Sequence, residues 1–437
     1  MTPIARAAAA IEVLEDVFRR HRPVGDVLKD WGLSHRFAGS GDRAAIGNLV
    51  FDALRRRASL AWRMGSEEPR ALVLGALRFV WAMPAEAIEA AMAADRHAPA
   101  PLSEAERAAL AGATLDGAPD AVRADVPAWL AGDLAAVFGD RLVAEGEALA
   151  VRPPLDLRVN TLKSTREKVM AALDRLGPVA TPFSPVGVRI PVADGPGRAP
   201  HVQSDEGYAR GWFEIQDEGS QLAALLAGAR PGDQVLDLCA GAGGKTLAMA
   251  AEMGNKGQIY AYDSDRRRFG DIFDRLKRAG AHDVQVRAPD RADVLDDLAG
   301  HMDLVLVDAP CTGSGTWRRR PDAKWRLGEA QLAVRVGEQA ALLAAAARYV
   351  RPGGRLVYVT CSLLPRENEG QIAAFLSAHP GFTLADPAAA WMMALGTAMP
   401  DAFAAPVESF GRAVRLTPAT AGTDGFFVAV MQAERPA

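Results

Sequence analysis

The sequence predicts an α/β fold with a mostly parallel sheet, preceded by a small α+β domain and an all-helical N-terminal domain. In the C-terminal half, short apolar segments alternate with helical stretches, as in parallel sheets that helices cover on both faces. Near the N-terminus, apolar residues recur at helical spacing. At 437 residues the chain is too long for one core. We therefore expect a helical domain at residues 1–140, an α+β domain at 141–228 and an α/β domain at 229–437.

The composition, with 49% apolar and 24% charged residues, is that of an ordinary soluble protein. The net charge is −4, so a polyanionic partner would have to bind to local basic patches. Three cysteines cannot form a disulfide framework and favour a reducing compartment. The most apolar long window, residues 71–83, contains Arg78 and is too short to span a bilayer. We expect a cytoplasmic monomer that binds neither a membrane nor a metal.

The first domain is predicted to be helical because residues 6–18 and 42–64 each place apolar side chains along one helix face. The second of these patterns ends in the basic run 55–57. Proline-rich segments near 99–101 and 152–154 indicate linkers.

The second domain is predicted to mix strands and a helix. The helix covers residues 164–176, with Ser164 as its N-cap and Glu167 three residues later. The expected strands are 155–160, 188–190 and 212–216.

The third domain contains the segments that predict the parallel sheet. A last apolar strand, 426–431, follows the turn-like sequence GTDG. The other expected strands are 235–238, 258–262, 284–287, 304–307 and 355–359.

A glycine-rich loop, CAGAGGKT (residues 239–246), follows the first of these strands. Ligands of open parallel sheets bind beyond the carboxyl ends of the strands, and glycine lets the backbone approach them closely. A phosphate loop would need glycine where Cys239 stands, and the dinucleotide motif would need glycine where Thr246 stands. S-adenosylmethionine fits better, because it has no phosphate and needs a close turn and carboxylates.

Carboxylates stand at the ends of the first three strands. Asp237 lies in the first strand, and Asp263 ends the second, 22 residues after Gly241, which is a typical spacing for a ribose contact. Asp290 follows the third strand and could approach the adenine; Asp293 is the weaker candidate. A single aspartate at a strand end often only caps a helix, but three beside a glycine loop indicate a cofactor site.

All three thiols also follow strands. Carbon-5 of a pyrimidine attacks a methyl donor only weakly, and a thiolate added to carbon-6 makes it enamine-like, so Cys311 and Cys361 suggest covalent catalysis. Asp308 is placed to hydrogen-bond a protonated cytosine edge. Cys239 fits a small buried apolar residue better.

Several blocks of the sequence resemble the Sun family of RNA cytosine-5 methyltransferases, whose bacterial members modify small-subunit ribosomal RNA. The blocks are DAPCTGSGT (308–316), RRRPDAKW (318–325), TCSLLPRENEG (360–370), GTDGFFVAV (422–430), RVNTLK (158–163) and IQDEGSQL (215–222). The resemblance covers most of residues 150–437. It implies a Rossmann-like class I methyltransferase with a mostly parallel seven-stranded sheet and S-adenosylmethionine as cofactor. Residues 42–56 resemble a NusB-like RNA-binding domain more weakly.

The resemblance also implies roles for individual residues. Cys361 would be the nucleophile, and Cys311 would assist product release. Where the family commonly has Pro-Gly, this chain has Ala242-Gly243, which removes rigidity but no hydrogen-bond donor. The implied cofactor contacts are Cys239, Ala240, Gly241, Ala242, Gly243, Gly244, Lys245, Asp263, Asp290 and Asp308.

The segment 318–326 is predicted to bind RNA. Its cations and tryptophans suit phosphate neutralisation and base stacking, and we expect contacts from Arg318, Arg319, Lys324 and Trp325. A solvated loop is the alternative for this segment. For the whole protein, the alternatives are a ribosome-assembly factor with an inactive methyltransferase fold, methylation of tRNA, and methylation of DNA.

Overall fold

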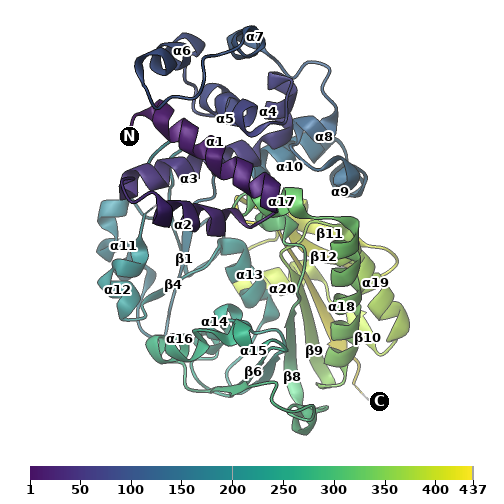
Figure 1. Ribbon diagram of the computed structural model, residues 1–437. Helices are drawn as coiled ribbons and strands as arrows, with labels where there is room; N and C mark the ends of the chain where they lie inside the picture. Colours follow the sequence, from purple (N-terminus) through teal and green to yellow (C-terminus); the bar gives the residue numbers. More distant parts are fainter. Residues whose placement is uncertain (199, 436–437) are drawn as a thin grey trace. The chain divides into compact units, whose positions relative to one another are not determined.

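The structure is a computed structural model that describes residues 1–198 and 200–435 (Figure 1). The chain forms two compact units. The helical unit consists of Met1–Pro153, Val192–Ala199 and Thr316–Leu327, and the sheet unit consists of Pro154–Pro191, Pro200–Gly315 and Gly328–Ala437. The small α+β part and the large sheet therefore share one unit, and residues 316–327, expected in the α/β domain, belong to the helical unit.

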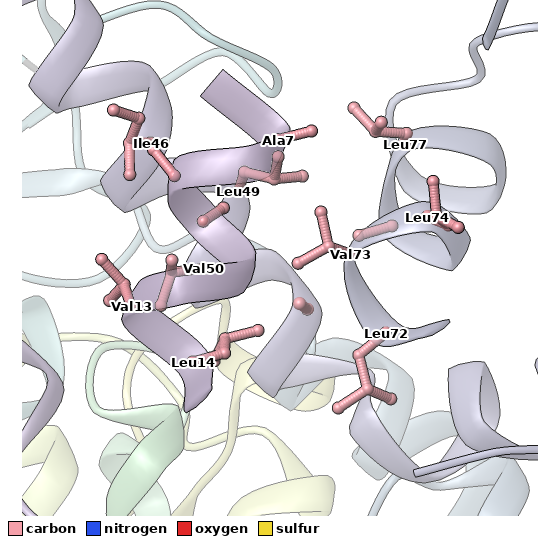
Figure 2. Packing of buried hydrophobic residues seen from close by; sticks show 14 of the residues in the cluster. Ala7, Val13, Leu14, Ile46, Leu49, Val50, Leu72, Val73, Leu74 and Leu77 are labelled. Carbon is pink, nitrogen blue, oxygen red and sulfur yellow. The ribbon is translucent and has the colours of Figure 1, made fainter. Parts of the chain in front are cut away.

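The helical unit is built around a core that gathers apolar side chains from several helices, among them α1, α3 and α5 (Figure 2). In α1, Ala7, Val13 and Leu14 are buried because they recur on one face of the helix. The α-helices of this unit are α1 (Pro3–Arg20), α2 (Val24–Ser34), α3 (Ser40–Arg55), α4 (Arg57–Met64), α5 (Pro69–Gly75), α6 (Ala85–Ala94), α7 (Glu104–Gly112), α8 (Asp120–Arg123), α9 (Ala131–Phe138), α10 (Leu142–Leu149) and α17 (Pro321–Arg326).

The pattern at residues 42–64 forms two helices rather than one, because the chain leaves helical geometry at Arg56, where φ is −114° and ψ is 28°. A buried carboxylate compensates for the break. Asp125 accepts hydrogen bonds from the Ser59 backbone N–H at 2.9 Å and from the Ser59 hydroxyl at 2.7 Å. The first turn of α4 thus finds an acceptor that periodicity cannot reveal.

The small antiparallel sheet of the sheet unit has the strand order β2-β3-β1-β4. The predicted helix is shorter than expected, and its N-cap is Thr165, not Ser164, since the Thr165 side chain accepts from the Lys168 N–H. The elements of this part are β1 (Leu155–Val159), α11 (Arg166–Ala172), β2 (Val179–Ala180), β3 (Gly187–Ile190), α12 (Glu206–Ala209), β4 (Phe213–Ile215) and α13 (Glu218–Ala227).

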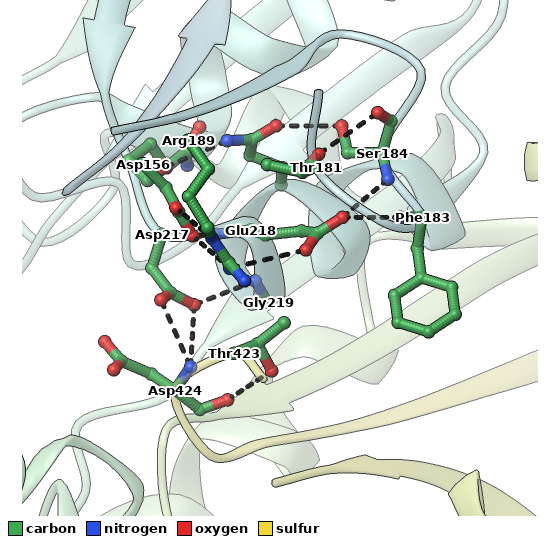
Figure 3. Close-up of polar contacts among 12 residues, drawn as sticks. Asp156, Thr181, Phe183, Ser184, Arg189, Asp217, Glu218, Gly219, Thr423 and Asp424 are labelled. Carbon is green, nitrogen blue, oxygen red and sulfur yellow. Dashed lines mark hydrogen bonds and ion pairs between the residues drawn. The ribbon is translucent and has the colours of Figure 1, made fainter. Parts of the chain in front are cut away.

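A polar cluster connects the small sheet to α13 (Figure 3). Arg189 donates to both oxygens of Asp156 at 2.7 and 2.8 Å. Glu218 accepts from the backbone of Phe183 and Ser184 at 2.7 and 2.8 Å. The neighbouring Asp217 accepts the Asp424 N–H at 3.0 Å, which fixes the turn before the last strand.

The large sheet has the order β11-β12-β13-β9-β8-β5-β6-β7, with β10 on β13. Its strands are β5 (Gln234–Asp237), β6 (Gln258–Tyr262), β7 (Val284–Arg287), β8 (Met302–Asp308), β9 (Val350–Thr360), β10 (Phe382–Leu384), β11 (Ala404–Val407), β12 (Gly411–Leu416) and β13 (Phe426–Ala433). Its helices are α14 (Gly244–Glu252), α15 (Arg266–Phe269), α16 (Ile272–Ala279), α18 (Glu329–Ala347), α19 (Glu369–Ala378), α20 (Pro387–Leu395) and α21 (Pro418–Ala421).

The predicted parallel strands are confirmed, because β7, β6, β5, β8 and β9 pair in parallel. The expected number of strands is wrong: within the described part of the chain the sheet has nine strands, not seven. The short strands β10, β11 and β12 had no expected counterpart. Pro406 lies in β11, where an edge strand tolerates a missing N–H donor.

The parallel pairing places the ends of β5, β6, β8 and β9 along one edge of the sheet, and the candidate site residues follow these ends. In residues 1–198 and 200–435, no helix is both long and apolar enough to cross a bilayer.

Candidate active site

The loop between β5 and α14 depends on its glycines. Gly241 and Gly243 have left-handed backbones, with φ of +51° and +81°. A Cβ atom on Gly243 would lie 2.9 Å from the Ile272 side chain. The Gly241 N–H donates to the Asp263 carboxylate at 3.1 Å, so the loop after β5 is held by the carboxylate that follows β6.

Asp237 and Asp263 are both almost completely buried, each 1% exposed. Asp237 accepts the Thr246 hydroxyl at 2.6 Å, and its other oxygen has no hydrogen-bond partner in the described structure. Burial raises the pKa of Asp237 to about 7. Asp263 also accepts the Asp265 N–H at 3.0 Å. Buried acceptors beside a glycine turn are suited to a polar ligand.

Asp290 and Asp293 differ from this buried pair. The Asp290 side chain is 59% exposed and pairs with Arg266 at 2.8 Å, and Asp293 pairs with Arg291 at 3.2 Å. Neither carboxylate joins the hydrogen bonds around Gly241. The cofactor contact of Asp290 stays a prediction.

Lys245 and Asp308 form an ion pair, with 2.6 Å between the ammonium nitrogen and a carboxylate oxygen. Lys245 is buried, and its ammonium lies 5.4 Å from the centre of the Phe426 ring. Asp308 is partly exposed at the end of β8. The pair thus presents a carboxylate of fixed orientation at the edge of the sheet.

The Sγ atoms of Cys311 and Cys361 lie 3.4 Å apart, within hydrogen-bond distance. They come from the loops after β8 and β9, which are parallel neighbours. The hydrogen bond to Cys361, together with burial, raises the pKa of the Cys311 thiol well above its usual range. Burial also raises the pKa of Cys239. The raised pKa favours the protonated form of the Cys311 thiol.

Glu367 connects the two loops that carry Cys311 and Cys361, which we call the cysteine loops. It is fully buried, and its carboxylate accepts the Thr312 N–H at 2.8 Å, the Thr312 hydroxyl at 2.5 Å, the Gln339 amide at 3.0 Å and the Ser362 hydroxyl. Thr312 follows Cys311, and Ser362 follows Cys361. One carboxylate therefore fixes the chain beside both thiols.

Two glycines bring a third loop to the thiols. The Gly315 N–H donates to the Cys361 carbonyl at 2.9 Å, and the Gly425 N–H donates to the Gly315 carbonyl at 2.8 Å. A Cβ atom on Gly315 would lie 2.3 Å from the Gly425 oxygen. The sequence GTDG before β13 is therefore part of the site.

The four residues predicted to bind RNA lie in the helical unit, and two of them are buried. Arg318 and Lys324 are 4% and 2% exposed, and their contacts with RNA stay a prediction. The Lys324 ammonium donates to the Arg55 carbonyl at 2.9 Å. Trp325 is partly exposed and donates to the Leu54 carbonyl at 2.7 Å, and Arg319 is also partly exposed.

The role of Glu367 was not predicted, although it lies in the block TCSLLPRENEG. A glutamate is rarely fully buried unless it has partners, and the apolar residues Leu363 and Leu364 just before it were a signal of burial. Its partners Thr312 and Gln339 are far away in sequence, so only the fold identifies them.

Comparison with known proteins agrees with this geometry. A family model described as 16S rRNA methyltransferase RsmB/F matches residues 224–432, and a RsmF/B-like ferredoxin-like domain matches residues 126–193. The ribosomal RNA small subunit methyltransferase B of Sodalis glossinidius is 35% identical over 73% of this chain and 69% of its own length. The probable counterpart from Synechocystis is 37% identical over 54% of this chain and 53% of its own length. The crystal structure of PH0851 has a TM-score of 0.71 and 25% identity, covering 99% of both chains.

The fold and site define a methyltransferase that uses S-adenosylmethionine and acts on RNA, as the sequence predicted. The chain belongs to the RsmB/F family of RNA methyltransferases, the Sun family, so the predicted membership is confirmed.

Proposed function

We propose that this protein methylates carbon-5 of a cytosine in small-subunit ribosomal RNA, with Cys361 as nucleophile. The observation that carries the proposal is the pair of thiols 3.4 Å apart at the ends of β8 and β9. The relatives named as small-subunit ribosomal RNA methyltransferases support the choice of substrate. A base must be unstacked to reach such a site, which favours a single-stranded target.

The residues around the glycine loop fit the cofactor. The left-handed backbone of Gly241 allows close approach, and Asp263 and the unpartnered oxygen of Asp237 are buried acceptors for its hydroxyl and amino groups. Residues 239–245 would line it, with Asp290 at the adenine. When bound, S-adenosylmethionine supplies an electrophilic methyl group.

The reaction follows from the thiols. The Cys361 thiolate adds to carbon-6 of cytosine, and the electron pair of the 5,6 double bond becomes available at carbon-5. After methyl transfer, carbon-5 carries both the methyl group and its original hydrogen. Removal of that proton re-forms the double bond and expels the Cys361 thiolate, so the net change is methyl for hydrogen with release of one proton.

The neighbours of Cys361 suit these steps. The raised pKa of Cys311 favours its protonated form, which suits a group that assists the breakdown of the adduct rather than one that attacks carbon-6. Cys311 then assists the breakdown of the adduct. Asp308, oriented by Lys245, is available to hydrogen-bond the cytosine edge that becomes protonated during addition.

The test separates the two thiols in the full-length protein, with labelled S-adenosylmethionine and RNA from small ribosomal subunits that lack 5-methylcytosine. Cys361→Ser should abolish methyl transfer and form no covalent product. Cys311→Ala should still attack and accumulate protein-linked RNA, visible as a denaturation-resistant band. An adduct in the Cys361 variant, with none in the Cys311 variant, would overturn the assignment. Methylated DNA in place of RNA would overturn the substrate.

A further inference from the structure

A cavity of about 330 Å³ opens in the helical unit, away from every residue assigned above except Trp325. This volume is in the range of small-ligand pockets. It is lined by the C-terminal end of α1, the start of α4, and α17. The lining residues that matter are Phe18, His21, Arg57, Asp322, Trp325 and Arg326.

Arg57 is held between two aromatic rings of this cavity. Its guanidinium lies 4.7 Å from the centre of the Phe18 ring and 5.3 Å from that of Trp325. The Trp325 indole is fixed by its hydrogen bond to the Leu54 carbonyl. Arg57 pairs with Glu67 at 2.9 Å, but Glu67 is 73% exposed, so this contact is weak and easily exchanged. The cavity thus presents a pre-oriented guanidinium whose partner a stronger anion can replace.

The charge of the cavity is positive. Two guanidiniums, Arg57 and Arg326, face one carboxylate, Asp322. Asp322 is buried and already accepts from Arg326 at 2.7 Å and from the Val24 N–H at 3.4 Å. An anion entering the cavity would therefore meet cations, because the one carboxylate among the described lining residues is already hydrogen-bonded.

We propose that this cavity binds one nucleotide of single-stranded RNA, with the phosphate on Arg57 and Arg326 and the base against the rings. Planar aromatic walls with an arginine fork match the stacking and phosphate contacts by which proteins hold unpaired nucleotides. A base within a duplex cannot enter a concave site of this size. The inference rests on the proposed RNA substrate, and it moves the RNA contact from Arg318 and Lys324 to the cavity.

The test measures binding of a fluorescein-labelled, ten-nucleotide single-stranded RNA to the full-length protein over a series of salt concentrations. Arg57→Gln should weaken binding about tenfold or more at low salt. It should also reduce the slope of log K against log salt by about 0.7, the value for one phosphate contact to a single strand. Arg326→Gln should lower the slope similarly. Arg63→Gln is the matched control, because Arg63 also lies over a phenylalanine, Phe79, at 4.6 Å, but outside the cavity.

The proposal is overturned if Arg57→Gln and Arg326→Gln, folded by circular dichroism, keep the wild-type slope, or if Arg63→Gln loses as much. A lower melting temperature with unchanged RNA binding would give Arg57 a structural role only. Displacement of the RNA by a polyglutamate peptide at equal charge concentration would indicate an acidic protein ligand instead. Methyl transfer by the wild-type protein is measured separately. Its absence alongside a reduced slope would reject the proposed function and leave the cavity a nucleotide site.

Discussion

Replacing Glu367 should uncouple the two cysteine loops, and the hydrogen bonds predict by how much. One oxygen accepts the Thr312 N–H and the Gln339 amide, and the other accepts the hydroxyls of Thr312 and Ser362. In Glu367→Gln the amide oxygen can still accept from the Thr312 N–H and the Gln339 amide. The hydroxyls of Thr312 and Ser362 can rotate and accept hydrogen bonds from the new NH₂ group. The loss is then mainly that of charge assistance, about 1–3 kcal/mol.

Glu367→Ala leaves more buried hydrogen-bond donors without an acceptor than Glu367→Gln does. The Thr312 N–H and the Gln339 amide lose a buried acceptor, at about 1.5–3 kcal/mol each for bonds to a charged group, or roughly 3–6 kcal/mol together. A displacement of about 1 Å at either thiol can slow the reaction about 100-fold. We therefore expect the glutamine variant to fold and to form the Cys361 adduct slowly, and the alanine variant to be strongly destabilised.

The assay combines urea unfolding with the rate of adduct formation, measured in a Cys311→Ala background so that the adduct accumulates. Glu329→Gln is the control, since Glu329 pairs with Arg366 near the same segment but is 63% exposed, and its loss should cost less than about 1 kcal/mol. If Glu367→Gln formed the adduct as fast as the Cys311→Ala protein that retains Glu367, the idea that this carboxylate positions the thiols would be refuted. If Glu329→Gln lowered the free energy of unfolding as much as Glu367→Gln, the buried carboxylate would be no more important than the exposed one, and the argument from burial would be refuted.

Three further predictions concern the same unit. Asp263→Ala should weaken S-adenosylmethionine binding by at least about 1–3 kcal/mol, and unchanged affinity in calorimetry would contradict the ribose contact. The pKa of Asp237 is raised to about 7, so the folded state binds a proton that the unfolded chain releases above its ordinary value of 3.8. Its contribution to unfolding free energy should therefore fall with pH across this window, and Asp237→Asn should flatten the curve; an unaltered pH profile would contradict the shift. Gly315→Ala should destabilise by more than about 3 kcal/mol in thermal unfolding, because its Cβ atom meets the Gly425 carbonyl, whereas Gly337→Ala in α18, with open space around it, should be neutral or stabilising by up to about 1 kcal/mol. Similar effects of the two substitutions would contradict the steric argument.

The strands at the centre of the large sheet could be predicted because burial on both faces requires continuous apolar runs. The expected ranges 258–262 and 284–287 coincide with β6 and β7. The hairpin of β11 and β12 could not be predicted in this way. Its edge strand β11 contains Pro406, which is accepted there because one side of an edge strand makes no ladder hydrogen bonds.

The part of the candidate site that could be predicted consists of reactive residues that come directly after strands in the sequence. The sequence places Cys311 and Cys361 after parallel neighbours, and the register of β8 and β9 brings them to 3.4 Å. Contacts made by backbone groups leave no pattern in the sequence. The Gly315–Cys361 hydrogen bond and the four bonds to Glu367 exist only after three loops have met.

Charge in a sequence does not indicate exposure, as residues 318–326 illustrate. Helix α3 ends at Arg55, and the last carbonyls of any helix lack intrahelical donors. Lys324 and Trp325 supply donors to the carbonyls of Arg55 and Leu54, a cation at the negative end of the helix dipole and an indole beside it. Burial lowers the pKa of Lys324 to about 8, because the charged ammonium is kept away from water. The same basic and aromatic composition thus serves two purposes. Lys324 closes a helix inside the unit, whereas the exposed part of Trp325 and the neighbouring Arg326 belong to the proposed nucleotide site, and only burial distinguishes the two roles.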